Sequence, residues 1–227
     1  MAPPRARTGL PLGKVLVIGG ALFLIFLLYR HMHPPPPARP TASLPPEEIR
    51  ALTGRQIALV AGHLGSDPGA TCADGLTEQS VNRRIVEHAA EILRSVPAQV
   101  MVLQEYDPRL DGLQADVFLS VHADSCLPLS GFKVARWARS PHPARDDRLV
   151  RCLRYHYWLI TGLSPDPEHV TEDMTEYHAF HRVAPDTPAA IIEVGYLGGD
   201  RELLTQRPDL PALGIVEGLA CFLGGTP

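Results

Sequence analysis

The sequence predicts a three-layer α/β/α domain with a mostly parallel mixed sheet, preceded by one N-terminal transmembrane helix. Short apolar runs that suit buried strands alternate with longer amphipathic segments that suit helices. A strongly apolar, uncharged run lies near the amino terminus and has no counterpart later in the chain. The length of 227 residues allows one substantial hydrophobic core and no second domain of ordinary size.

The apolar run covers residues 15–29, and a bilayer core needs roughly 20 such residues. It therefore spans only if residues 10–12 contribute and the charged flanks snorkel. Basic residues flank the run on both sides: Arg5, Arg7, Lys14 and Arg30. Prolines follow it rather than the small residues of a cleavage site, which favours an uncleaved signal anchor at 15–30 over a cleaved signal peptide or a buried core helix. We expect the basic tail 1–14 to stay in the cytoplasm and the rest to be exported.

Proline dominates the segment that follows the anchor. Seven of the 23 prolines lie within residues 34–46, where they prevent a helix from continuing. We interpret residues 31–50 as an extended stalk that holds the domain away from the lipid, with a disordered linker as the alternative. The globular domain is assigned to residues 51–227.

Charge divides the chain at the same boundary. Six of the 21 basic residues lie in the first fifty positions, where only Glu47 and Glu48 oppose them. From residue 51 onward acidic residues outnumber basic ones. Nucleic-acid binding needs clustered Lys and Arg, so no nucleic-acid partner is expected.

The first half of the domain predicts strands and helices in alternation. An apolar run at 56–61 indicates a buried strand that ends in a turn-rich loop. A helix is predicted from Glu78 to about Ser95, because apolar residues recur there at helical spacing: Val81, Ile85, Ala89 and Ile92. Thr77, directly before it, is the predicted N-cap. Three further strands are predicted at 99–103, 116–122 and 132–137, followed by a helix over about 146–160.

The second half of the domain is less regular. Residues 161–188 are interpreted as mostly loop, with one short strand near Phe180. The run at 189–194 again indicates a buried strand. A terminal helix begins at Asp209 and places apolar residues on one face: Leu213, Val216, Ala220 and Leu223.

Polar residues that follow buried strands are the candidates for chemistry, because ligands gather at the carboxyl ends of strands in such sheets. His63 follows the first strand, Glu78 opens the first helix, His122 closes the strand at 116–122, and Glu193 lies in the strand at 189–194. Two histidines and one carboxylate can hold zinc with a position left for water, and a further carboxylate can act as a base. Taken singly, each residue has a structural alternative: a hydrogen-bonded histidine, a glutamate at a helix start, or a buried ion pair.

The sequence around these residues carries four ordered motifs. They are GHLGSDPGA at 62–70, GLTE at 75–78, ADVFLSVHA at 115–123 and EVGYL at 193–197. In this order they resemble the motifs of the zinc-dependent N-acetylmuramoyl-L-alanine amidases of the type-3 amidase family. The resemblance covers about residues 56–223.

The resemblance implies zinc ligands at His63, Glu78 and His122 and a catalytic glutamate at Glu193. It further implies hydrolysis of the amide that joins N-acetylmuramic acid to L-alanine in peptidoglycan, by zinc-bound water with the glutamate as base. The anchor would place this activity on the extracytoplasmic side of the cell membrane. Two alternatives are a catalytically silent module that binds peptidoglycan or regulates, and a zinc peptidase or amidase with another substrate.

The chain departs from the family pattern at three places. Val60 and Ala61 stand where an acidic residue usually begins the first motif, and Leu64 replaces its second glycine. Asp124 stands where the family usually has asparagine. Only residues 108–114 separate Asp107 from the next strand, where the family usually has an Arg-containing helix, and so short a connection could open the groove.

Four cysteines permit disulfides in an exported domain, with three connectivities if all of them pair. Cys72 and Cys126 lie in loops just beyond the metal-site motifs, so we favour that pair. Cys152 and Cys221 lie in predicted helices, where they are interpreted as small buried hydrophobic residues. Among the other histidines, His178 or His181 could reach substrate, whereas His88 and His156 are expected at the surface or an interface.

Overall fold

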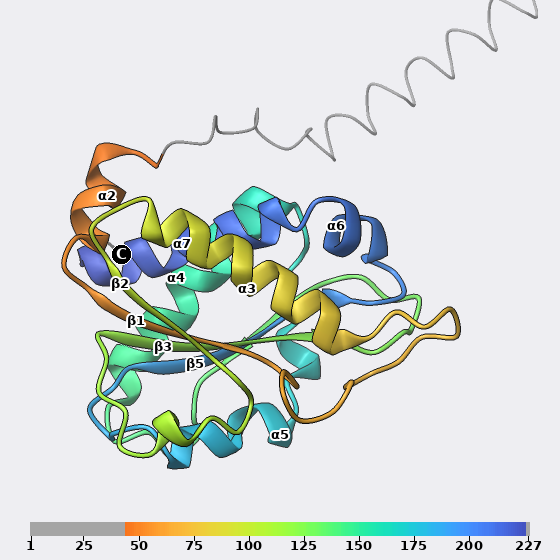
Figure 1. Ribbon diagram of the computed structural model, residues 1–227, viewed down its shortest axis with the longest axis horizontal. Helices are drawn as coiled ribbons and strands as arrows, with labels where there is room; N and C mark the ends of the chain where they lie inside the picture. The colour runs from red at the N-terminus through yellow and green to blue at the C-terminus, as the bar shows by residue number, and fades with distance from the viewer. Residues whose placement is uncertain (1–43, 226–227) are drawn as a thin grey trace, which may run out of the picture. The chain divides into compact units, whose positions relative to one another are not determined.

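Five strands form the sheet in the order β2-β1-β3-β5-β4, with β4 antiparallel to β5 and the other neighbours parallel (Figure 1). The computed structural model describes residues 44–225. The strands are β1 (Gln56–Ala61), β2 (Gln99–Leu103), β3 (Val117–Asp124), β4 (Lys133–Ala135) and β5 (Ala189–Tyr196). The predicted mostly parallel mixed sheet is therefore confirmed, and five of the six predicted strand regions pair in it.

Long helices cover one face of the sheet. They are α3 (Glu78–Arg94), α4 (Pro143–Thr161) and α7 (Asp209–Gly224), joined by the shorter α2 (Pro46–Leu52) and α6 (Arg201–Gln206). The side chain of Thr77 accepts a hydrogen bond from the backbone N–H of Ser80, so the predicted N-cap of α3 is confirmed. Helix α7 contacts α2, α3 and α4, and this explains why most of its residues are buried.

A close approach between α4 and α7 depends on glycine. A Cβ atom added at Gly218 would lie 2.8 Å from the Cα atom of Leu153, closer than side chains tolerate. The absence of a side chain at Gly218 thus lets the two helix backbones pack at short distance.

The opposite face carries a thin layer of short elements, with α5 below the sheet in the view of Figure 1. These elements are the 3-10 helices η1 (Pro108–Leu110), η2 (Pro167–His169) and η3 (His178–His181), together with α5 (Glu172–Thr175). Buried side chains of this layer, including Leu110, Met174 and Phe180, form a second apolar cluster with the sheet. The three-layer prediction holds, but one outer layer contains no long helix within residues 44–225.

The predicted strand near Phe180 is wrong. The segment forms η3 and closes its hydrogen bonds locally, from Phe180 N to Tyr177 O and from Arg182 N to Ala179 O. Ala179 and Phe180 are buried against the sheet face, so this segment covers the sheet instead of extending it.

The domain begins earlier than residue 51. Helix α2 starts at Pro46, inside the segment interpreted as a stalk, because Leu44 and Leu52 are buried in the main core. The predicted tail 1–14, the anchor at 15–30 and the stalk up to residue 43 lie outside the described residues. Within residues 44–225, no helix combines the length and the hydropathy that a membrane span requires.

Two disulfides are present. Cys72 pairs with Cys126, as predicted. Cys152 and Cys221 are also bonded, joining α4 to α7, so their interpretation as simple buried hydrophobic residues was wrong. The prediction that both are buried residues of helices is confirmed, but a local pattern carries no information on which residues of two separate helices face each other.

Candidate active site

The four candidate residues meet in one cleft of about 760 Å³ at the carboxyl end of the sheet. His63 follows β1, Glu78 is the first residue of α3, and His122 and Glu193 lie on the neighbouring strands β3 and β5. Parallel strands end at the same edge of a sheet, which is why positions so far apart in sequence converge here.

The backbone of His63 adopts an unusual conformation that aims its ring into the cleft. Its φ angle is +64°, a region that residues with a side chain rarely adopt. Two carboxylates hold it: the His63 backbone N–H donates to Glu105 at 2.7 Å, and ring Nδ1 donates to Asp67 at 2.7 Å. The Gly69 N–H also donates to Asp67, which fixes that carboxylate in turn.

The carboxylate of Glu78 lies between the two histidines. Its Oε2 atom is 3.2 Å from Nε2 of His63, and its Oε1 atom is 3.1 Å from Nδ1 of His122. Three further N–H donors bind it: the backbone of Ala70, the backbone of Ala123 and the side chain of Asn82. Burial would raise the pKa of Glu78, but the hydrogen bonds with both histidines outweigh it and hold the pKa well below its usual range.

The donor set fits a divalent metal ion. Ligand atoms of His63, Glu78 and His122 all lie within 4.8 Å of one another. Two imidazole nitrogens and one carboxylate oxygen are a set that zinc uses in catalytic sites, with room for a further ligand. The remaining nitrogens face carboxylates, His63 Nδ1 towards Asp67 and His122 Nε2 towards Glu105 at 3.5 Å. Such outer carboxylates orient metal-binding imidazoles.

Both histidines have raised pKa values without a metal. The hydrogen bond to Glu78 raises the pKa of His63 to about 9. Burial alone would lower the pKa of His122, but the hydrogen bond with Glu78 and the charges of nearby carboxylates, Glu193 and Glu105 among them, raise it. At neutral pH a metal ion therefore has to displace a proton from His63.

Glu193 is poised next to this cluster. It pairs in register with His122, and its Oε2 atom is buried without a hydrogen-bond partner among residues 44–225. Burial is the main cause that raises the pKa of Glu193 to about 7. A carboxylate with a pKa near neutrality can both accept and return a proton, which is what a general base and acid must do.

Two further charged residues flank Glu193. Lys133 is the register partner of Glu193 on β4, and its ammonium forms an ion pair with Asp124 at the end of β3. Lys133 also lies 5.2 Å from the centre of the Tyr196 ring. Asp124, which departs from the family pattern, thus has a partner of opposite charge in Lys133. This ion pair joins β3 to β4 across β5, next to Glu193.

Sequence reasoning missed the buried network behind the histidines. Glu105 accepts hydrogen bonds from the Tyr177 hydroxyl at 2.8 Å and from His178 Nε2 at 2.7 Å, and Ser120 donates to Tyr177. One of the two histidines expected near substrate, His178, lines the cleft. Glu105 could have been found by the strand-end rule that selected His63, because it follows β2.

The connection after β2 is short. Residues 108–110 form only η1, and the Tyr106 side chain beside them is 61% exposed. The Tyr106 ring stacks on His178 at 4.5 Å and lines the cleft, while Glu172, Asp173 and Glu176 of the α5 region border another part.

A sequence profile described as N-acetylmuramoyl-L-alanine amidase matches residues 57–219, which is more than half of the chain. No curated protein sequence matches the chain.

Several solved structures share the fold. The N-acetylmuramyl-L-alanine amidase Ami1 from Mycobacterium smegmatis has a TM-score of 0.65 at 17% identity, covering 77% of this chain and 99% of that one. The CwlD amidase from Clostridioides difficile, in complex with the GerS lipoprotein, has a TM-score of 0.60 at 20% identity, covering 75% and 98%. The catalytic domain of CwlV, an amidase from Bacillus (Paenibacillus) polymyxa var. colistinus, has a TM-score of 0.54 at 21% identity, covering 71% and 94%.

Proposed function

This chain belongs to the N-acetylmuramoyl-L-alanine amidase family and hydrolyses peptidoglycan, and we propose that it does so with zinc held by His63, Glu78 and His122. The observation that carries the proposal is the convergence of these three donors in one cleft with Glu193, whose Oε2 atom has no hydrogen-bond partner in the described part of the chain. The bond cleaved is the amide between N-acetylmuramic acid and L-alanine.

The zinc ion would supply Lewis-acid polarisation of the scissile carbonyl and of the attacking water. Glu193 accepts the proton that the water loses as its oxygen adds to the carbonyl carbon. Glu193 then delivers that proton to the alanine nitrogen as the C–N bond breaks. The pKa of Glu193, raised by burial to about 7, supports both transfers at neutral pH.

The neighbouring carboxylates keep the ligands in place. Asp67 and Glu105 face the outer nitrogens of His63 and His122, so each imidazole presents its other nitrogen towards Glu78. Glu105 also accepts a hydrogen bond from the His63 backbone N–H, so one buried carboxylate lies next to both ligand histidines.

We further propose that residues 15–30 anchor the chain in the cell membrane, with the catalytic domain on the extracytoplasmic side. Two disulfides support an oxidising location for the domain. The basic residues before the apolar run agree with the direction of export inferred from the sequence.

The test uses residues 44–227, a start that retains Leu44 and α2 in the core. We expect the purified domain to bind about one zinc per chain and to release stem peptides from peptidoglycan. Glu193→Ala should retain zinc but lose hydrolysis, whereas Glu91→Ala, at an exposed position on α3, should resemble the wild type.

Each alternative has its own outcome in this assay. A domain that binds peptidoglycan without hydrolysis would indicate a silent binding module. Glu193-dependent cleavage of another amide, with peptidoglycan left intact, would indicate a different substrate. A domain that takes up no zinc would refute the proposed metal site.

A further inference from the structure

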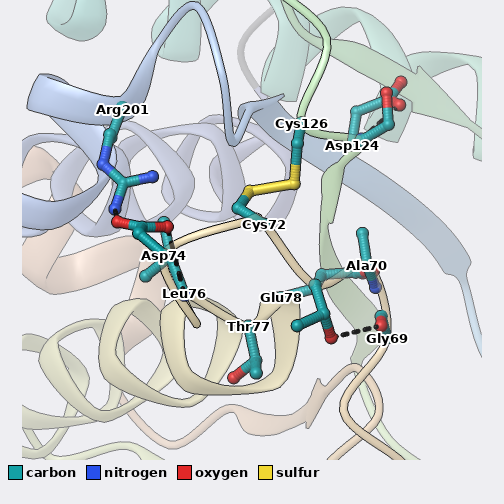
Figure 2. Close-up of a disulfide and its surroundings, with 12 residues drawn as sticks. Gly69, Ala70, Cys72, Asp74, Leu76, Thr77, Glu78, Asp124, Cys126 and Arg201 are labelled. Atoms are coloured by element: carbon teal, nitrogen blue, oxygen red, sulfur yellow. Dashed lines mark hydrogen bonds and ion pairs between the residues drawn. A yellow bond between two sulfur atoms is a disulfide. The ribbon is translucent and has the colours of Figure 1, made fainter.

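We propose that the Cys72–Cys126 disulfide is a positioning element of the metal site, which holds Glu78 against His122 and thereby sets the affinity for the metal. The inference deepens the proposed function and rests on its metal site. Figure 2 shows the bond joining the loop before Glu78 to the segment that leaves β3 near Asp124.

Cys72 lies in a small hairpin that ends at the metal ligand. Thr71 and Thr77 pair as an antiparallel bridge, and the Cys72 N–H donates to Leu76 O at 2.9 Å. The hairpin then passes into α3, whose first residue is Glu78. The Glu78 N–H donates to Ala70 O at 2.8 Å, so displacement of the hairpin would displace the backbone of the ligand.

Few hydrogen bonds connect the hairpin to the rest of the described protein. Within residues 44–225, the hydrogen bonds of residues 71–76 stay inside the loop, apart from the ion pair of Asp74 with Arg201. That pair is largely exposed, at 57% and 39% of the two side chains, and exposed ion pairs contribute little. Cys72 and Leu76 also pack against the main apolar core, and the disulfide is the covalent constraint on this side of Glu78.

Cys126, by contrast, sits on a firmly held segment. Its loop packs against the turn after β5 so closely that a Cβ atom added at Gly198 would lie 2.4 Å from the Cys126 carbonyl oxygen. Leu197 N donates to Asp124 O, and Gly131 N donates to the carboxylate of Asp200. Cys126 follows directly on β3, the strand that carries His122. The disulfide therefore ties the hairpin before Glu78 to β3.

The other disulfide provides a matched control. Cys152 and Cys221 join α4 to α7 with a Cα–Cα distance of 5.7 Å, compared with 5.6 Å for Cys72 and Cys126. The two bonds span similar lengths of chain, 69 and 54 residues, so their loss should affect the unfolded chain to a similar extent. They differ in that neither Cys152 nor Cys221 lies in a metal-site loop.

The experiment compares Cys72→Ala/Cys126→Ala with Cys152→Ala/Cys221→Ala in the full chain. Zinc affinity is measured by competition with a chromophoric chelator, at a temperature where far-UV circular dichroism shows all proteins folded. We expect the first variant to bind zinc about tenfold more weakly or worse, and the second to stay within about twofold of the wild type. Both should show a lower Tm.

Equal zinc affinity in the wild type and the Cys72/Cys126 variant would overturn the inference, as would equal losses in both variants. If the first variant does not fold, Cys72→Val/Cys126→Ala fills the buried Cys72 position and takes its place under the same criteria. A wild type that binds no zinc would refute the metal site itself. That result differs from one in which the wild type binds zinc and loss of the disulfide leaves the affinity unchanged.

Discussion

His122 and Glu193 are register partners on the adjacent parallel strands β3 and β5. Paired residues on neighbouring strands point to the same face of a sheet, so a ring nitrogen and an unpaired carboxylate enter the cleft side by side. Backbone hydrogen bonds of the sheet hold this pair, and sites built on such rigid elements keep their geometry better than sites on loops.

Glu193→Gln should stabilise the metal-free protein at alkaline pH. Burial raises the pKa of Glu193 from 4.5 to about 7, so in this window the folded state holds a proton that the unfolded state has lost. Stability therefore falls as the pH rises through the window, by about 3 kcal/mol on the linkage relation. Urea unfolding with chelator should show the variant more stable at pH 8 and nearly equal to the wild type at pH 5. A difference independent of pH would contradict this account.

Metal binding should release protons and strengthen as the pH rises. The pKa of His63 is raised to about 9 by its hydrogen bond to Glu78, so at pH 7 this ring is protonated in the metal-free protein. Calorimetric titration with zinc, in buffers of different ionisation enthalpy, should show release of at least about one proton at pH 7. The released fraction should decline above pH 9, and the absence of any release at pH 7 would count against the cluster as the metal site.

Lys133→Met should move the acid limb of the activity profile to higher pH. Burial is the main cause of the raised pKa of Glu193, and the positive charge of Lys133 partly offsets it. Without that charge Glu193 needs a higher pH to ionise. We therefore expect the acid limb of the pH profile of kcat/KM to shift upward by about half a pH unit or more. Asp124→Asn should shift it the opposite way, and the double variant should return near the wild type. Parallel shifts in both single variants would exclude this electrostatic role.

Gly218→Ala should destabilise the fold by about 1–3 kcal/mol, the usual effect of overpacking. The new methyl group would lie 2.8 Å from the backbone of Leu153, at the contact between α4 and α7. Helix propensity alone favours alanine over glycine by about 1 kcal/mol, so the two effects have opposite signs. Thermal unfolding should show a lower Tm with zinc affinity unchanged, and a higher Tm would show that the helices separate easily.

The parts of the fold predictable from the sequence were those that local patterns encode. The alternation of apolar runs placed β1, β2 and β5, and apolar residues at helical spacing placed α3 and α7. The thin layer over the second sheet face was not predictable, since η1, α5 and η3 are too short for periodicity to show. Helix α2 was hidden by its own prolines, which are tolerated at a helix start when nearby leucines are buried.

By itself the sequence predicted that His63, Glu78, His122 and Glu193 lie together, because parallel strands end at one edge of the sheet, and the structure places all four in one cleft. Only the tertiary structure decided which groups surround them: Glu105 behind the histidines, and Lys133 with Asp124 beside Glu193. It also decided that Cys152 meets Cys221. These contacts depend on strand register and on which helix faces meet, and both are set by packing across distant parts of the chain rather than by any local pattern.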